Sequence, residues 1–494
     1  MIKAEQIIKK GNWLKNFFTH RQHPIRIISY TTKYMWLLVI PLAKYLIATK
    51  FNFQDWVKAN WVDILTISVI FGYAILRWVF VYFELEDDCI IAHTGYFGIA
   101  KTRVYFSEMS SMSLCQGYFF RAIHACTLYI DTDAKTLQSA DITLDLTTKQ
   151  AKGIYQLATE HSLKKPTYTF TSKKSTLVIF SLLFSSTLSG VVLVISAIYE
   201  AYRVVGREIE QRFLERVNTE IEKTFTAVPK YILIAGIVIA GGWLLSFVAN
   251  LMRHWNFSCT RGKDCFIIKS GKGAKRRHVL VKNRIYCIDY QQSLLMKIFK
   301  ICTVSVKCTG YGKRRKEISA LIPITTSRLV DKNMKLLMPG LPKMNAEVKT
   351  GVFDLGRFLT MPIVFSLVPP VAGLFSVRFF PLWEKEIKTF VLISLIPLIW
   401  FCAVKAIAAL TTFVGISNDY FTIAYCNWYR FHREYIHVDR ISKICVTQNP
   451  FQKVSGTCNL IIYPKSETVS PQRIAGLNHK KTVDMLNSGG YTFV

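Results

Sequence analysis

Two short runs of bases are the residues best suited to binding chemistry in this sequence of 494 residues. Lys275, Arg276 and Arg277 form the first run, and Lys313, Arg314, Arg315 and Lys316 form the second. The pattern around both runs predicts turns between strands, and neighbouring cations in a turn can hold a phosphate group through charge-assisted hydrogen bonds. Beside a membrane, each such base contributes about 1 kcal/mol of attraction to anionic lipid. The alternative is a solvated basic face that has no specific ligand.

The positive charge of the chain is unevenly distributed. The net charge is +31 at pH 7, and residues 253–355 hold 22 bases against 6 acids, a net charge of +16. Residues 84–174, by contrast, hold 10 bases and 10 acids. Interleaved exposed aromatic residues and a recognition helix are missing, so the pattern favours a membrane surface over nucleic acid.

Catalytic and metal-binding motifs are missing from the sequence. The ten histidines are scattered, and none belongs to an HExxH motif or has a convincing serine or cysteine partner. There is no GxxxxGK[ST] loop, and the twelve cysteines include neither a CxxC pair nor a Cys/His group with zinc spacing. We therefore expect no enzymatic activity, no cofactor and no metal.

Three segments of the chain are copies of one another. Each runs from a Gln to a Cys ten residues later, followed by two alternating apolar residues, and an Asp lies 28 or 29 residues before the Gln. The copies are Asp88, Gln116, Cys126, Leu128 and Ile130; Asp264, Gln292, Cys302, Val304 and Val306; and Asp419, Gln448, Cys458, Leu460 and Ile462. We expect each Gln to bond a turn backbone and each Cys to be a small buried residue. Such a repeat predicts a repeated architecture.

A pair of long apolar segments precedes each copy. The six segments are about 30–48, 61–83, 175–199, 231–252, 357–377 and 390–413. Most of them reach the roughly 20 residues that a helix needs to cross a bilayer. The sequence therefore predicts a multi-pass α-helical membrane protein.

The repeat and the spans together predict seven regions. A segment of residues 1–29 is followed by helix pairs at 30–83, 175–252 and 356–413, which alternate with modules at 84–174, 253–355 and 414–494. The second helix pair encloses a long external loop, 200–230. Each module shows short alternating strands followed by one helix, which is typical of a small rolled sheet closed by that helix. We expect each module to keep its own sheet.

Charge and cysteine placement predict the orientation. Six spans put both termini and all three modules on one side, and that side carries the basic excess, which marks the cytoplasm. Eleven cysteines lie in the modules or their membrane junctions, in keeping with a reducing compartment.

Several motifs resemble a known family. Arg21-Gln22-His23-Pro24 precedes the first span, and Arg284-Ile285 and Arg440-Ile441 precede two of the strands that end in the repeated Gln. Pro450 and Gly456 complete the motif in the third copy. Together they resemble the bacterial membrane-flanked PH-like domain of the YdbT type. The first copy departs at Glu108-Met109, and His124 and Lys300 stand where the family has Gly.

The resemblance implies PH-like modules in a bacterial inner membrane and no known catalytic reaction. Membrane lipids are the implied partners, and a smaller membrane protein with a single PH-like module, or an oligomer, would also fit. We expect a binding or scaffold protein. The alternative is a transporter or channel-like protein with regulatory modules, which a polar pathway through the spans would distinguish.

Overall fold

The computed structural model describes the chain in segments: 21–32, 54, 57–58, 60–95, 99–132, 140–159, 167–184, 230–308, 320–351, 355–417, 419–465 and 471–491. Most of the predicted spans at 30–48 and 175–199, nearly all of the loop at 200–230 and the run Lys313–Lys316 lie outside these residues.

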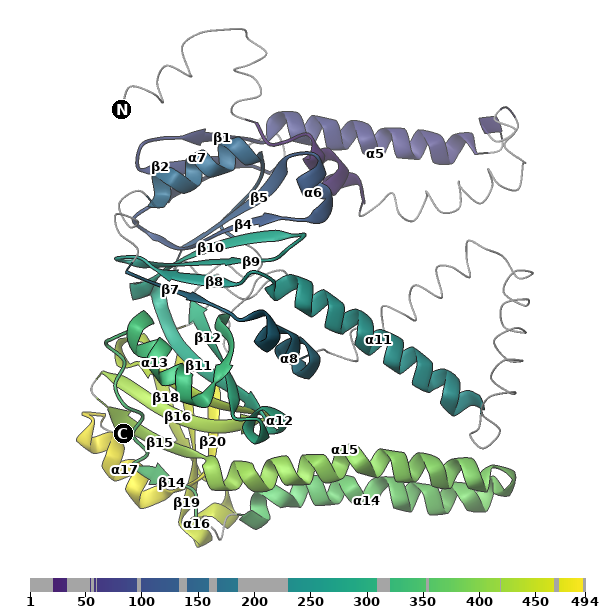
Figure 1. Ribbon diagram of the computed structural model, residues 1–494, viewed down its shortest axis with the longest axis vertical. Coiled ribbons are helices and arrows are strands. Elements are labelled where there is room, and N and C mark those ends of the chain that lie inside the picture. The colour runs from purple at the N-terminus through teal and green to yellow at the C-terminus, as the bar shows by residue number, and fades with distance from the viewer. Residues whose placement is uncertain are drawn as a thin grey trace. The chain divides into compact units, whose positions relative to one another are not determined.

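Each repeat copy contains six strands and then a helix, in the same order (Figure 1). The first copy consists of β1 (Tyr82–Leu85), β2 (Cys89–Thr94), β3 (Ala100–Tyr105), β4 (Met109–Gln116), α6 (Tyr118–Ala122), β5 (Ala125–Thr132), β6 (Ile142–Thr147) and α7 (Thr148–Thr159). The second consists of β8 (Ser258–Arg261), β9 (Cys265–Ser270), β10 (Lys275–Val281), β11 (Ile285–Ser293), α12 (Leu294–Ile298), β12 (Ile301–Cys308), β13 (Ala320–Thr326) and α13 (Ser327–Leu337). The third consists of β15 (Phe413–Ser417), β16 (Tyr420–Asn427), β17 (Arg430–His437), β18 (Ile441–Thr447), α16 (Pro450–Ser455), β19 (Thr457–Pro464), β20 (Gln472–Asn478) and α17 (His479–Ser488). Two short strands, β7 (Tyr168–Thr171) and β14 (Val348–Lys349), pair with β8 and β15.

The repeated Gln has one structural role in all three copies. Its side-chain amide donates to the carbonyl oxygen nine residues later, at 3.0 Å from Gln116, 2.8 Å from Gln292 and 2.7 Å from Gln448. The predicted bond to the turn backbone is therefore present in each copy. Cys126, Cys302 and Cys458 are each the second residue of the following strand and are buried. Each repeated Asp directly precedes β2, β9 or β16, and all twelve cysteines are free.

The turn that follows each Gln also has the same backbone. His124, Lys300 and Gly456 have φ values of 55°, 52° and 65°, the left-handed region that favours glycine. Their carbonyl oxygens accept the amide N–H of the first residue of α7, α13 and α17, respectively. The conformation therefore survives in the two copies that have lost the glycine.

Strands of neighbouring copies pair with each other, which corrects the expectation that each module keeps its own sheet. In the first joint β10 pairs antiparallel with β4, and in the second joint β17 pairs antiparallel with β11. The equivalent residues Leu280 and Ile436 lie opposite Ser111 and Cys287, each of which stands five residues before its Gln. An edge strand with free N–H and C=O groups is satisfied by such pairing.

The chain accordingly forms two compact units and not three. The first is Met1–Thr167, Phe184–Asn256 and Gly262–Val281, and the second is Tyr168–Leu183, Phe257–Arg261 and Lys282–Val494. The middle copy is divided between them. Ile267 and Val279 belong to the core that contains Leu128 and Ile130, whereas Cys287 belongs to the core of Leu460 and Ile462. The alternating apolar pairs are buried, as the period of two predicts.

The long helices are apolar. Within the described residues, four stretches are long and apolar enough to cross a membrane: Trp61–Phe80, Gly236–His254, Leu355–Phe379 and Pro381–Thr411. They lie in α5 (Trp61–Phe80), α11 (Lys230–His254), α14 (Leu355–Phe379) and α15 (Glu384–Thr411), while α8 (Lys174–Phe184) is shorter. Four of the six predicted spans thus fall on such helices.

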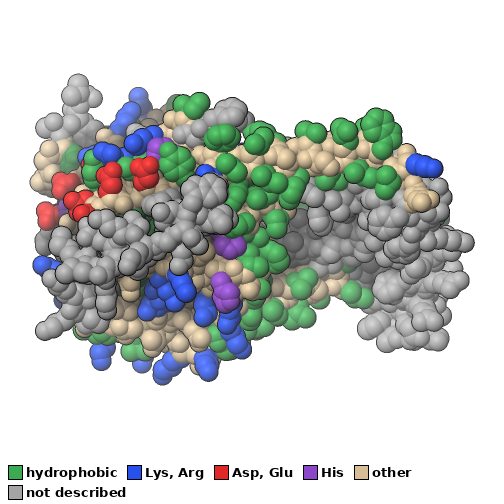
Figure 2. Space-filling model, turned by 90° about the horizontal axis from the view of Figure 1, so that it is seen from above, with side chains coloured by type: hydrophobic (Ala, Val, Ile, Leu, Met, Phe, Trp, Pro, Cys, Tyr) green, Lys and Arg blue, Asp and Glu red, His purple; other side chains and the backbone are tan. Residues whose placement is uncertain are grey.

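Two of these helices, α14 and α15, run side by side (Figure 1). A Cβ atom on Gly373 would lie 2.5 Å from Val391 Cγ2, so glycine permits the close approach. Large apolar side chains point outward, with Leu374 75% and Phe390 71% exposed. Figure 2 shows another face of the protein. Hydrophobic side chains cover a long helix there, and most Lys, Arg, Asp and Glu side chains lie away from that helix. A lipid surround would cover such hydrophobic side chains.

Candidate functional site: a basic pocket at the first joint

The first predicted run of bases lies in a strand and not in a turn. Lys275, Arg276 and Arg277 open β10, where they lie opposite Gln116, Cys115 and Leu114 of β4. The turn is confined to the residues just before them, because Gly271 has φ 96° and a Cβ there would lie 1.9 Å from Ala274 O. Pairing with β4 therefore extends the strand into the basic run.

These bases line a pocket of about 290 Å³ that lies wholly within the first unit. Its walls come from β4, β5, α7, β9 and β10. The lining residues are Leu114, Gln116, Cys126, Thr148, Ala151, Lys152, Asn256, Lys269, Ser270, Gly271, Lys275, Arg276 and Arg277. The volume is close to the lower end of small-molecule sites, which are about 300–1,000 Å³.

The lining of this pocket, which we call the basic pocket, is strongly cationic. Five of its residues are Lys or Arg and none is acidic. Lys269 lies opposite Arg277 across β9 and β10, and burial and then Arg277 lower the pKa of Lys269. Burial also lowers the pKa of Arg276. Both shifts disfavour the charged forms, so an anion in the basic pocket would relieve them.

Two contacts organise the basic pocket. The Arg277 guanidinium carbon lies 4.9 Å from the centre of the Tyr155 ring, a cation–π contact that orients the side chain. Gln116 Nε2 donates to Thr148 Oγ1 at 3.3 Å and ties β4 to α7. The walls therefore consist of regular elements held to one another, which suits a preformed site.

The basic pocket lies next to the end of a long apolar helix. Gly271 N donates to Trp255 O at 2.7 Å, directly after α11, and Asn256 lines the pocket itself. The Lys272 ammonium lies 5.3 Å from the centre of the Trp255 ring. Trp and Lys at the end of an apolar helix are typical of the membrane interface. The basic pocket therefore adjoins the end of a helix that is long and apolar enough to cross a membrane.

The second unit holds an equivalent pocket with a different charge. It has a volume of about 390 Å³ and is lined by Tyr290, Gln292, Cys302, Ser327, Val330, Asp331, Met334, Lys335, Leu341, Pro342, Lys343, Met344, Arg433 and Tyr435. Thr148 and Ser327 begin equivalent helices, so Asp331 stands where the basic pocket has Lys152. In the same way, Arg433 opposite Tyr290 matches Arg277 opposite Leu114. An acid therefore accompanies the bases here.

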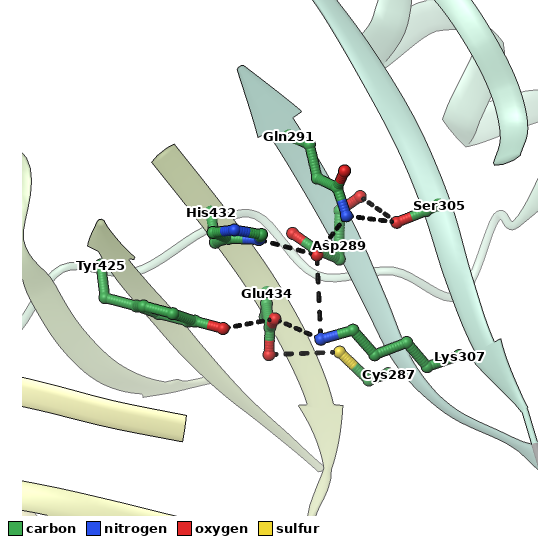
Figure 3. A network of polar contacts seen from close by, with 8 residues as sticks. All are labelled: Cys287, Asp289, Gln291, Ser305, Lys307, Tyr425, His432 and Glu434. Carbon is green, nitrogen blue, oxygen red and sulfur yellow. Dashed lines mark hydrogen bonds and ion pairs between the residues drawn. The ribbon is translucent and has the colours of Figure 1, made fainter. Parts of the chain in front are cut away.

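The second joint also contains a buried polar network (Figure 3). Asp289 and Glu434 have fully buried side chains, and Lys307 Nζ lies 2.6 Å from Glu434 Oε1 and 3.8 Å from Asp289 Oδ2. His432 Nδ1 is 2.9 Å from Asp289 Oδ2, and Tyr425 OH donates to Glu434 Oε1 at 2.9 Å. The residues come from β11, β12, β16 and β17. This network could not be predicted from the sequence, because its members become neighbours only when two copies pair.

This network has the form of a buried ion pair. Asp289, His432 and Glu434 could supply ligand atoms to a metal, but the Lys307 ammonium already lies between the two carboxylates. Burial lowers the pKa of Lys307, while Cys287 and the two carboxylates raise it by more, so the net pKa lies well above its usual value. A charged lysine in this place competes with a metal ion. The expectation of no metal and no cofactor stays a prediction.

Comparison with known proteins gives the family context. The model of the bacterial PH domain family matches residues 30–160, 178–332 and 363–487, which together are most of the chain. The UPF0699 transmembrane protein YdbT of Bacillus subtilis (strain 168) is 19% identical over 320 residues. That alignment covers 60% of this chain and 63% of the relative, less than two thirds of its length. No solved structure matches the chain. Each matched stretch contains at least one described apolar helix and most of one repeat copy.

Proposed function

The chain belongs to the bacterial PH domain family, and from that premise we propose that it is a non-enzymatic membrane protein whose basic pocket binds the phosphate head group of an anionic lipid. The observation that carries the proposal is the set of five bases without an acid in the pocket wall. Clustered guanidinium and ammonium groups match phosphate oxygens. The place of the pocket beside Trp255 supports a lipid source for that phosphate.

We further propose that the modules and both termini face the cytoplasm of a bacterial inner membrane. The basic excess and the cysteines support this orientation. In a chain without native cysteines, single cysteines placed at 205–225 should react with an impermeant thiol reagent added from outside. Cysteines placed near residue 313 should be protected, and the opposite labelling pattern would reverse the orientation.

The competing hypothesis is a transporter or channel whose modules regulate it. A pathway needs ionisable or polar side chains that line a cavity between spans. None of the three pockets found in the modules among the described residues has a lining residue in α14 or α15. The binding or scaffold role therefore has the stronger support.

The lipid proposal is tested by the lipids that accompany the full chain. The protein is purified in a mild non-ionic detergent, and phosphatidylglycerol and phosphatidylethanolamine are measured by mass spectrometry. Arg277→Gln should lower the ratio of the anionic to the zwitterionic lipid. Arg433→Gln is the matched control, because it removes an equivalent arginine from a pocket that contains Asp331. An unchanged ratio in Arg277→Gln, or an equal fall in both variants, would refute the proposal.

A further inference from the structure

Two strands, β3 in the first copy and β18 in the third copy, lie at the edges of their sheets. Each joint pairs the third strand of one copy with the fourth strand of the copy before it, β10 with β4 and β17 with β11. By this rule β3 of the first copy lacks a preceding neighbour and β18 of the third copy lacks a following one. Among the described residues, β3 pairs only with β2 and β18 pairs only with β19. In the described part of the chain, one third strand (β3) and one fourth strand (β18) therefore lack the partner that such a strand has at the internal joints.

The two joints have the same register, residue for residue. In the first, Lys275 lies opposite Gln116, and in the second, Phe431 lies opposite Gln292. Lys275 and Phe431 are equivalent, since each lies five residues before the repeated apolar residue Leu280 or Ile436. Side chains alternate between the two faces of a sheet, so a slip of one residue would turn every side chain of the strand to the opposite face. The shared register therefore marks the joint as a property of the repeat.

We propose that β18 of one copy of this chain pairs with β3 of a second copy in the register of the two internal joints. The equivalences place Lys101 opposite Val446, Thr102 opposite Cys445 and Val104 opposite Lys443. The assembly is head-to-tail, so that it can extend from copy to copy. It also places Lys101 of the second copy beside the third module in the position that Arg277 and Arg433 occupy at the internal joints.

The side chains of the two edges repeat the pattern of the internal joints. A base lies opposite an apolar or aromatic residue at one position, Arg277 with Leu114 and Arg433 with Tyr290. Lys101 and Val446 continue this pattern. Two polar residues meet at the next position. In the first joint His278 Nδ1 lies 2.8 Å from Ser113 Oγ, and in the second joint Asp289 lies opposite Glu434, with Lys307 pairing with both carboxylates. Thr102 and Cys445 are small and polar enough to meet in the same way.

The β18 edge has apolar side chains that are less buried than their equivalents at an internal joint. Ile444 and Val446 are partly buried and pack on the core of their own module, whereas the equivalent Met112 is fully buried. Pairing would remove more of their apolar surface from water, which is favourable. Pairing with β3 would therefore give β18 the burial that β4 has at the first joint.

The β3 edge differs from β10 and β17 at one position that is buried in those two strands. Arg103 stands where these strands have Val279 and Tyr435, and its exposed ion pair with Glu86, at 3.5 Å, contributes little stability. The arginine stem can cover Ile444 while the guanidinium stays in water. A charged edge also limits uncontrolled sheet growth. The joint between copies should accordingly be weaker than the internal ones.

The test is a disulfide between differently tagged full-length chains in native membranes. One chain carries Thr102→Cys and Cys445→Ser, and the other keeps the native Thr102 and Cys445. Oxidation should give a mixed-tag dimer, because residues opposite each other in a sheet have the Cα spacing of a disulfide. Arg103→Cys on the first chain is the control, since its side chain points to the other face. Cys445→Ser on the second chain should also abolish the dimer.

A mixed-tag dimer that needs both Thr102→Cys on one chain and Cys445 on the other would support the pairing. Absence of the mixed-tag dimer, an equal amount of dimer from Arg103→Cys, or a link to a different protein would overturn it. A second measurement avoids oxidation and compares recovery of one tagged copy with the other. Val446→Lys should reduce co-purification through repulsion with Lys101, and Lys101→Glu in the other copy should restore it. Indifference to both charges would likewise refute the pairing.

Discussion

The two internal joints share one backbone and differ in charge. In the first, the strands meet through Ser113 and His278, and the adjoining pocket keeps its bases without an acid. In the second, the equivalent residues are the acids Asp289 and Glu434, which Lys307 neutralises. The repeat therefore fixes which strands pair, while a few side chains decide what a joint can bind. Fold alone does not identify the ligand of such a module.

The largest expected effect distinguishes the two joints by stability. Lys307→Met removes the ammonium that lies between two buried carboxylates. Breaking a buried pair from one side costs about 3–5 kcal/mol. We expect amide hydrogen exchange in β11 and β17 to accelerate accordingly.

Ser113→Ala is the matched change at the first joint. It removes the hydrogen bond to His278, which should cost about 1 kcal/mol and leave β4 and β10 mostly protected. If Lys307→Met loses no more protection than Ser113→Ala, the paired charges do not stabilise the second joint.

The second prediction exchanges the pocket charges. Lys152→Asp in the basic pocket and Asp331→Lys in the second pocket reverse one charge each, at equivalent helical positions. At about 1 kcal/mol per base, a reversal of about 2 kcal/mol changes affinity for anionic lipid by more than tenfold. The first variant should lose retained phosphatidylglycerol and the second should gain it.

A control for this exchange lies on the same helix. Lys149 is exposed on α7 and does not line the basic pocket. Lys149→Asp changes the net charge of the chain by the same amount as Lys152→Asp. Equal lipid loss in these two variants would assign the effect to general charge and not to the pocket.

Much of this comparison could be predicted from the sequence. The three Gln-to-Cys copies follow from repeated residues, and the buried pairs follow from the alternation of apolar residues. Four of the long apolar spans follow from runs of apolar residues. All of these signals are local in the sequence. The pairing between copies could not be predicted in that way. Both edges of a module show the same alternation whether they meet water or another strand, and strand partners are chosen by three-dimensional proximity.

The candidate site was predicted only in part. Lys275–Arg277 were singled out by their charge, but the turn around them was wrong, since pairing with β4 overrides the local turn signal of the glycines. Lys152 and Lys269 carry no local mark, because they join the pocket from α7 and β9. The Asp289 network was missed for the same reason. A charge that is buried by a distant segment looks like any surface charge in sequence.

The third prediction concerns the turn that both joints share. His124 and Lys300 hold a left-handed conformation that costs a side-chain-bearing residue roughly 1–2 kcal/mol. His124→Gly and Lys300→Gly should each stabilise the protein by about 0.5–1 kcal/mol, after the entropy that glycine adds to the unfolded chain. Thermal unfolding in detergent measures the gain.

The reverse change supplies the control for the turn. Gly456→Ala should destabilise by about 1 kcal/mol because its φ is 65°. Gly117 has φ −68°, and a Cβ there meets no atom within 4 Å, so Gly117→Ala should be tolerated. Equal effects of the two alanines would show that the left-handed turn is not the cause.

The smallest expected effect is a pKa difference. Lys297 occupies the position of Arg121 in the repeat, and its ammonium lies 3.8 Å from the centre of the Phe431 ring at the second joint. Burial and then Arg433 lower the pKa of Lys297 to about 8, against an offsetting contribution from Cys426. At the first joint Lys275 replaces the phenylalanine, and Arg121 is exposed.

The sign of this shift fixes its effect on stability. Between pH 8 and 10.5, the unfolded chain still binds a proton that folded Lys297 has released, so the free energy of unfolding rises with pH in that window. An NMR titration of methylated lysines should find the pKa of Lys297 near 8. Phe431→Ala should admit water, and Arg433→Gln should remove a neighbouring cation, so both should raise the pKa of Lys297. If Lys297 instead titrates near the ordinary lysine value of 10.5, the packing of β17 against α12 does not desolvate it, and this difference between the two joints does not exist.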